Sequence, residues 1–163
     1  DRRFTVLGGV RHGYKQMHRY YNELAEAARG EWLVVWNDDM DMLTDGWDEK
    51  LLSRREELIV MFLRRDISER CDTAYPVFPK RLFDLLGHVS MNCHCDSWLD
   101  VVSDKAGIRV FREDIVLHHH RLEDETAREI EYDWEAFNGS ADLGAIRAED
   151  VRRIRDALKG ATT

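Results

Sequence analysis

The sequence predicts an α/β fold with a mostly parallel sheet flanked by helices. Two runs of consecutive apolar residues, 32–36 and 58–63, have the composition of strands that are buried on both faces. Stretches with apolar residues at three- and four-residue steps, the spacing of one helix face, lie before, between and after these runs. Strands that alternate with helices along a chain are typical of a parallel sheet covered by its crossover helices.

Local signals set the bounds of each expected element. Met17 and Leu24 belong to the apolar face of the first helix, which Gly30 ends. Pro76 and Pro79 favour extended backbone after the second apolar run. In chain order we expect strand 4–7, helix 14–29, strand 31–36, helix 46–55, strand 58–63, extended segment 75–79, helices 80–86 and 94–106, strands 108–111 and 115–118, and helix 148–159.

Composition limits the class of protein. The chain has 163 residues, the length of one domain, and 44% of them are apolar, which is enough for a core. Its formal net charge of -8 argues against nucleic-acid binding, which needs a basic face. The three cysteines are an odd number and do not suggest a disulfide framework, so we expect a reducing, cytoplasmic compartment. No apolar run approaches the roughly 20 residues of a transmembrane helix.

The clearest chemical motif is the acidic turn that follows strand 31–36, with Asp38, Asp39 and Asp41. Ligands of open α/β sheets bind at this end of the strands. Residues two apart in extended backbone point the same way, so Asp39 and Asp41 are expected to bind one Mn²⁺ or Mg²⁺ ion together with substrate phosphates. An acidic chain that binds a diphosphate also needs a cation between the like charges. The alternative is a surface turn that caps the next helix, for which Asp45 alone would suffice.

The segment 13–41 resembles the central part of family 2 glycosyltransferases of the GT-A fold. The family pattern is a helix with an Asn, then Ala-x-Gly-Glu-aromatic, an apolar strand and an acidic D-x-D turn; here Asn22 and the segment 28–41 occupy these places. The resemblance implies a Rossmann-like GT-A core that transfers a sugar from a nucleotide diphosphate-sugar donor to a hydroxyl acceptor, with inversion. It assigns Asp39 and Asp41 to the metal, and Asp38 and Asp39 to the sugar nucleotide.

The same family carries an acidic residue at the start of a later helix, after a stretch similar to 76–87, as catalytic base. Asp96 is the candidate here, and Asp100, one helical turn later, is the alternative. The family's paired Glu-Asp is absent, and His94 and Cys95 precede Asp96 instead. A positioned carboxylate could take the proton of the acceptor hydroxyl. Capping of its own helix is an equally compatible role for Asp96.

Three consecutive histidines follow the strand that ends at Leu117. Several GT-A enzymes have a histidine here as an extra metal ligand. Strand alternation places His118 and His120 on one face, where either or both could bind the ion, and turns His119 away. Arg121 could bind phosphate through two parallel hydrogen bonds. The alternative for each histidine is a solvated strand end.

Two further sets of residues could bind ligands. The turn from Arg11 to Lys15 precedes a helix N-terminus, a natural anion site, and the resemblance places it at the nucleotide. The alternative is a basic loop that balances an acidic chain. Cys93, His94 and Cys95 could share a zinc ion with the later histidines, but the C-x-C spacing is too short for a structural zinc knuckle.

The resemblance covers about residues 4–121, as a GT-A-like core, and leaves 122–163 as a charged helical extension. It lacks the strand–helix units with which full GT-A enzymes bind the nucleoside base, so we expect a fragment, a partner chain that completes the sheet, or a minimal family member. An exposed sheet edge favours pairing with a second copy, which predicts a homodimer. The rival functions are a non-catalytic module that binds metal and sugar nucleotide, and a metal-dependent phosphohydrolase in which the same acids activate water.

Overall fold

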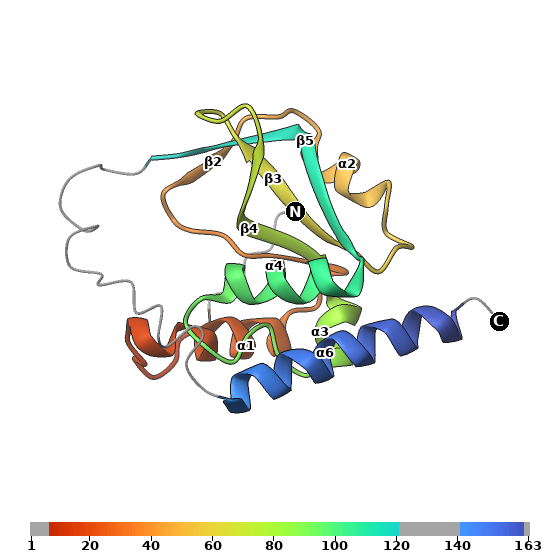
Figure 1. The fold of residues 1–163 in the computed structure, drawn as a ribbon. Helices are drawn as coiled ribbons and strands as arrows, with labels where there is room; N and C mark the ends of the chain where they lie inside the picture. The colour runs from red at the N-terminus through yellow and green to blue at the C-terminus, as the bar shows by residue number, and fades with distance from the viewer. Residues whose placement is uncertain (1–6, 121–140, 162–163) are drawn as a thin grey trace.

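The computed structural model describes residues 7–120 and 141–161 and shows a curled five-stranded sheet with helices on both faces (Figure 1). The prediction of an α/β fold is confirmed. None of the helices in these ranges is long and apolar enough to cross a membrane. In chain order the elements are the 3₁₀-helix η1 Tyr14–Gln16, α1 Met17–Ala27, β1 Trp32–Val34, β2 Met40–Met42, α2 Trp47–Leu52, β3 Val60–Arg65, β4 Cys71–Pro79, α3 Lys80–Leu86, α4 Cys95–Ala106, β5 Arg109–His119 and α6 Ala141–Gly160.

The sheet is mixed, so the prediction of a mostly parallel sheet is wrong. The strand order is β1-β4-β3-β5-β2, and within it β3 and β5 are parallel while the other three neighbouring pairs are antiparallel. Residues 66–70 alone join β3 to β4, and this connection is too short for the crossover that a parallel pair requires. The parallel strands β3 and β5 are joined through β4 and the helices α3 and α4, which make this connection long enough for a crossover.

The strand expected over 31–36 is shorter than predicted and lies at a sheet edge. β1 pairs with β4, and its three residues are half-buried rather than buried on both faces, because no other described strand lies beside it. Backbone hydrogen bonds from Val35 N to Pro76 O (3.0 Å) and from Lys80 N to Glu31 O (2.8 Å) extend the contact with β4 at both ends.

Strand alternation divides the core into two clusters, one on each face of the sheet. Val60 and Phe62 of β3 pack with α1, α3, α4 and α6, which Figure 1 shows together on one side of the sheet. Met61 and Leu63 pack on the other face with residues of α2, β2 and β5. Ile154 of α6 is fully buried in the first cluster, so the helix predicted as a C-terminal extension shares this core.

The two short strands expected near residues 108–118 form a single strand, β5. Its first half pairs with β3, and the register then shifts, with Leu63 opposite Arg112 and Arg64 opposite Val116. The last residues of β5 pair with β2 at the far edge of the sheet. The chain therefore passes from one edge of the sheet to the other between β1 and β2, and the acidic turn lies in this passage.

Candidate functional site

The acidic turn meets the histidine segment where β2 pairs with β5. Met40 lies opposite His119 in the register of the two strands, and Asp41 lies opposite His118. The N–H of His120 donates to the carbonyl oxygen of Asp39 at 2.8 Å. These two segments, which the sequence predicts as parts of one site, lie side by side in the structure. We call Asp39, Asp41, His118, His119 and His120 the Asp–His rim.

Asp39 and His119 form the half-buried pair of this rim. Asp39 Oδ2 lies 3.0 Å from His119 Nε2; the histidine side chain is 12% exposed and the carboxylate side chain 44%. His119 shares the inner face of β5 with the buried Leu117, and its Nδ1 lies 2.9 Å from the hydroxyl of Tyr75. The expectation that His119 turns away from the acidic turn is therefore wrong, because His119 is the histidine that contacts Asp39.

Asp41 and His120 form the exposed pair of the rim. Asp41 Oδ2 lies 2.6 Å from His120 Nε2, and the two side chains are 66% and 54% exposed. His118 shares the face of His120, as predicted, with 4.4 Å between their ring centroids. Its Nδ1 lies 2.7 Å from Oδ2 of Asp66, and this hydrogen bond lowers the pKa of Asp66. Asp66 follows β3, and no sequence motif marks it as part of a site.

The predicted metal ligands do not form one group. In the described ranges no three His, Cys, Asp or Glu side chains lie close enough together to hold a metal ion. The prediction that Asp39 and Asp41 point the same way requires both to lie in one strand, but β2 begins at Met40 and Asp39 lies in the turn before it. The expected set of Asp39, Asp41, His118 and His120 is thus divided, and Asp39 is paired with His119 instead.

The Asp39–His119 pair can nevertheless serve as half of a metal site. Mg²⁺ and similar hard ions are commonly held by one or two protein ligands, with waters and substrate phosphates completing the shell. A carboxylate oxygen and an imidazole nitrogen 3.0 Å apart need only a small separation to admit an ion between them. Asp38, beside Asp39, is exposed and makes no hydrogen bond or ion pair within the described part of the chain.

The predicted anion site before the first helix is partly occupied by the protein itself. The N–H groups of His12 and Gly13 both donate to the hydroxyl of Tyr20, the second at 3.2 Å, so these two donors are not available to a phosphate. Arg11 and Lys15 are exposed. Arg121, the other predicted phosphate ligand, lies outside the described residues.

The two candidate bases differ in their surroundings. Asp96 is half-buried in the first turn of α4, and its Oδ1 accepts a hydrogen bond from Ser97 N at 2.7 Å. Asp100 accepts one from the Arg109 guanidinium at 2.7 Å and is therefore engaged in an ion pair. Within the described residues, no hydrogen bond or ion pair links Asp96 to the acidic turn, and Asp96 differs from Asp100 in having no ion pair with a basic side chain.

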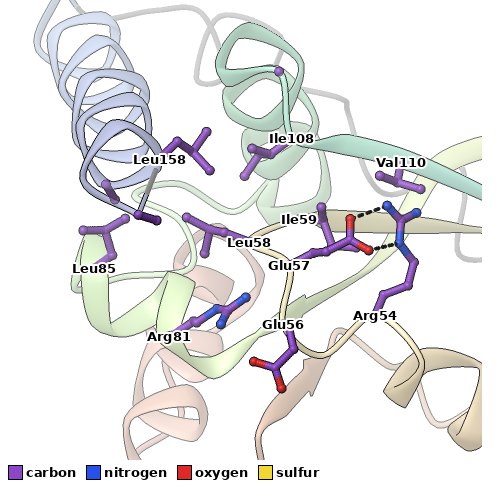
Figure 2. Close-up of a pocket in the computed structure, with 13 residues that line it drawn as sticks. Arg54, Glu56, Glu57, Leu58, Ile59, Arg81, Leu85, Ile108, Val110 and Leu158 are labelled. Carbon is purple, nitrogen blue, oxygen red and sulfur yellow. Dashed lines mark hydrogen bonds and ion pairs between the residues drawn. The ribbon is translucent and has the colours of Figure 1, made fainter. Parts of the chain in front are cut away.

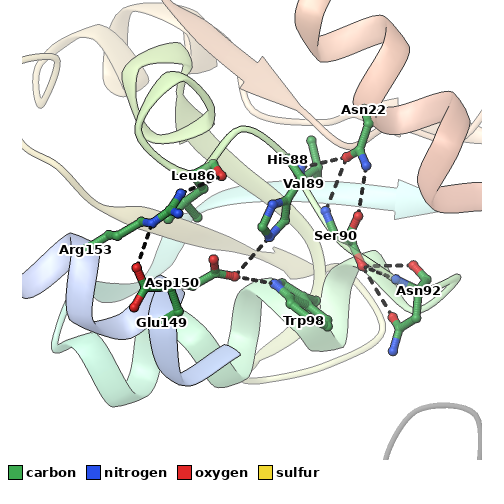
Figure 3. A network of polar contacts seen from close by, with 10 residues as sticks. All are labelled: Asn22, Leu86, His88, Val89, Ser90, Asn92, Trp98, Glu149, Asp150 and Arg153. Carbon is green, nitrogen blue, oxygen red and sulfur yellow. Dashed lines mark hydrogen bonds and ion pairs between the residues drawn. The ribbon is translucent and has the colours of Figure 1, made fainter. Parts of the chain in front are cut away.

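The loop that leads to Asp96 is held by a network that sequence reasoning missed (Figure 3). Asn22 of α1 accepts hydrogen bonds at Oδ1 from Val89 N (2.7 Å) and Ser90 N (3.3 Å), and it donates from Nδ2 to Ser90 O (2.9 Å). Ser90 Oγ in turn bonds to Asn92 O at 2.8 Å. Asn22 was noted only as part of a family pattern, and its role is to position the loop before α4.

A cavity of about 710 Å³ lies at the opposite end of the sheet, near the beginnings of β3 and β5 (Figure 2). Leu58, Ile108 and Leu158 form much of its wall, and the ion pair between Arg54 and Glu57 lies beside it. None of the predicted site residues lines this cavity. Charged side chains of Glu56 and Arg81 also line it, but it contains no aspartate or histidine of the kind predicted to bind the metal.

Comparison with known proteins adds no relative from which a role could be transferred. The arrangement of the Asp–His rim, the loop before α4 and Asp96 therefore has to be interpreted on its own chemistry. No family model, no curated protein and no solved structure matches the chain.

Proposed function

We propose that this protein is a glycosyltransferase that moves a sugar from a nucleotide diphosphate-sugar donor to a hydroxyl acceptor. Mn²⁺ or Mg²⁺ binds between the donor diphosphate and the Asp39–His119 pair. The observation that carries the proposal is the 3.0 Å contact between Asp39 Oδ2 and His119 Nε2. It lies at the carboxyl end of β5, which is parallel to β3, and open α/β sheets bind their ligands outside the carboxyl ends of parallel strands.

The composition of the pair implies that metal and donor bind together. Two protein ligands leave roughly four of the six positions of an octahedral ion for water and phosphate oxygens. In a chain of net charge -8, the ion also removes the repulsion between protein and diphosphate. It then stabilises the charge that develops on the departing nucleoside diphosphate. The carboxylate of Asp39 and the phosphate oxygens of the donor suit both Mn²⁺ and Mg²⁺.

The other predicted ligands take different roles. Asp41 and His120 are more than half exposed, so water competes for both groups, and we place this pair outside the metal site. Asp38 is exposed next to Asp39, and we assign it to the nucleotide. Arg11 and Lys15 are exposed and are assigned to the nucleotide phosphates through their side chains alone.

Asp96 is the proposed base. The acceptor oxygen forms a bond to the anomeric carbon as the bond from that carbon to the diphosphate oxygen breaks, and the hydroxyl proton passes to the Asp96 carboxylate. The nucleoside diphosphate is the leaving group, and an ion held by Asp39 and His119 would offset its negative charge. One direct displacement of this kind inverts the anomeric centre.

Calorimetry on matched pairs of variants tests the metal site. Mn²⁺ is titrated into the protein with UDP, GDP, ADP or dTDP present. The wild type is expected to bind Mn²⁺ with at least one diphosphate and much more weakly without it. Asp39→Ala and His119→Ala should weaken binding by about 100-fold, the upper range for a metal-site change, while Asp41→Ala and His120→Ala should change it less than about threefold. Wild-type titrations that stay flat with all four diphosphates would contradict the proposed function.

A transfer assay tests the base and the reaction class. The wild type with Mn²⁺ and the corresponding nucleotide sugars should release nucleoside diphosphate, faster when a hydroxyl acceptor is present. Asp96→Asn should keep metal-dependent donor binding and lose this release, whereas Asp100→Asn should retain it, because Asp100 is paired with Arg109. Release of inorganic phosphate instead would identify a hydrolase.

A further inference from the structure

Tyr75 has a backbone conformation that bulky side chains rarely adopt. Its φ is 56°, and it is the one residue other than glycine with a positive φ in the described part of the chain. The pairing of β3 with β4 is irregular at the same place, since Phe62 lies opposite Pro76 whereas Arg64 lies opposite Cys71. One residue of β3 therefore faces four residues of β4, and such a bulge redirects the side chains within it.

The redirected side chain reaches the Asp–His rim. The hydroxyl of Tyr75 lies 2.9 Å from Nδ1 of His119 and 3.4 Å from its Nε2, so Nδ1 is the nearer partner. The two rings meet edge to face, with centroids 5.4 Å apart. Since His119 Nε2 faces Asp39 at 3.0 Å, tyrosine, histidine and aspartate form a continuous line of polar contacts. Strained backbone that persists in a folded protein is concentrated at functional sites.

We propose that Tyr75 is a positioning residue that fixes the ring orientation of His119, and that it pairs with Nδ1 in either tautomer, so that Nε2 faces the metal ion. This inference rests on the proposed function. Metal-binding histidines usually have a hydrogen-bond partner at the other ring nitrogen, and that partner orients the ring. Tyr75 supplies the partner from β4, which β3 separates from β5 in the sheet.

A hydroxyl suits this role because it both donates and accepts. Without the ion, Nε2–H donates to Asp39, so Nδ1 carries a lone pair and accepts the Tyr75 O–H. With an ion at Nε2, the proton of a neutral imidazole would be on Nδ1, which would then donate to the Tyr75 oxygen. The contact of Nε2–H with Asp39 would be replaced by the ion, and the hydrogen bond to Tyr75 would reverse its direction. A phenylalanine ring could fill the same space but could not serve either state.

The test compares Tyr75→Phe with the wild type and with Tyr21→Phe as a matched control. Tyr21 is a half-buried tyrosine of α1 that packs against the other core cluster. Mn²⁺ binding is measured by calorimetry with UDP, GDP, ADP or dTDP present, and ¹⁵N spectra of histidine-labelled, metal-free protein report the tautomer of His119. Tyr75→Phe should weaken Mn²⁺ binding by about tenfold and give a mixture of tautomers, and Tyr21→Phe should change neither.

A double variant separates positioning from general damage. In the His119→Ala background, Tyr75→Phe should have no further effect on Mn²⁺ binding, because its target is gone. Thermal melts establish that each variant is folded. If the wild type binds Mn²⁺ while Tyr75→Phe binds equally well and retains a single tautomer, this inference is overturned and the proposed function stands. If the wild type binds no Mn²⁺ with any diphosphate, both fail together.

Discussion

Two Asp–His pairs of this protein have the same chemistry and opposite surroundings. Asp150 Oδ2 lies 3.0 Å from His88 Nε2, and these side chains are 2% and 12% exposed. The Asp39–His119 pair has the same 3.0 Å separation, but its carboxylate is 44% exposed. The indole N–H of Trp98 also donates to Asp150 Oδ2, at 3.0 Å, as Figure 3 shows.

The two pairs differ in whether the carboxylate can still accept a further hydrogen bond or a ligand. Asp150 joins α6 to the loop after α3 and to α4, and one of its oxygens already takes hydrogen bonds from two elements in a buried setting. Asp39 contacts one histidine and faces solvent, so an ion with its waters can reach it. Burial and the number of donors, rather than the residue types, thus separate a pair that holds the fold together from a pair that can bind a ligand.

The largest expected effect is on stability, at the buried pair. Asp150→Ala leaves both the Trp98 indole N–H and His88 without their acceptor, and it should lower the free energy of unfolding by about 3 kcal/mol. Urea denaturation measures this change. Asp150→Asn retains an acceptor oxygen and should cost about 1 kcal/mol. A loss below about 1 kcal/mol for the alanine variant would show that the buried pair does not hold α6 in place.

The next largest effect on stability is expected at the loop 87–94, which joins α3 to α4. Asn22→Ala removes two accepted hydrogen bonds and one donated bond to the backbone at Val89 and Ser90, and it should cost about 2 kcal/mol of unfolding free energy. Faster hydrogen exchange of the Val89 and Ser90 amides should accompany the loss. Glu26→Ala, an exposed change on the same helix, is the control and should lie within about 0.5 kcal/mol of the wild type.

A smaller effect is expected from a buried thiol near the same loop. Burial raises the pKa of Cys95 from its ordinary 9.0 to about 12. The unfolded chain therefore loses this proton first, and the folded state is destabilised as the pH rises above 9. Between pH 9 and pH 10 the free energy of unfolding should fall by about 1 kcal/mol more in the wild type than in Cys95→Ala. Equal slopes in the two proteins would mean that the thiol is accessible to water in the folded state.

Much of the local structure could be predicted from the sequence. The helix expected over 80–86 matches α3, and glycines with positive φ follow both α3 and α4. The antiparallel pairing of β3 with β4 was not predictable in the same way, because the connecting residues 66–70 contain no Asn-Gly or Asp-Gly turn signal. Bulges such as the one at Tyr75 likewise depend on how two strands pair, which periodicity does not report.

The sequence predicts which segments meet at the site, but it does not predict which side chains contact one another. Acidic residues after a strand and histidines at the end of another strand indicated where a metal could bind, and these segments do meet. The pairing differs because Asp39 lies outside β2, so that His119 rather than His118 or His120 is its partner. Tyr75 and Asn22 were missed because their contacts are made with residues distant in sequence.

The smallest effect on stability is expected at the Asp39–His119 pair. It tests most directly whether this pair differs from the buried Asp150–His88 pair. Asp39 is partly exposed and its ion pair with His119 is open to solvent, so Asp39→Ala should change the free energy of unfolding by less than about 0.5 kcal/mol. Removing one negative charge from a chain of net charge -8 also relieves repulsion, which opposes any loss. Urea denaturation without metal measures the change. A cost as large as that of Asp150→Ala would show that the rim pair is structural, since a carboxylate held for a ligand contributes little to the fold before the ligand binds.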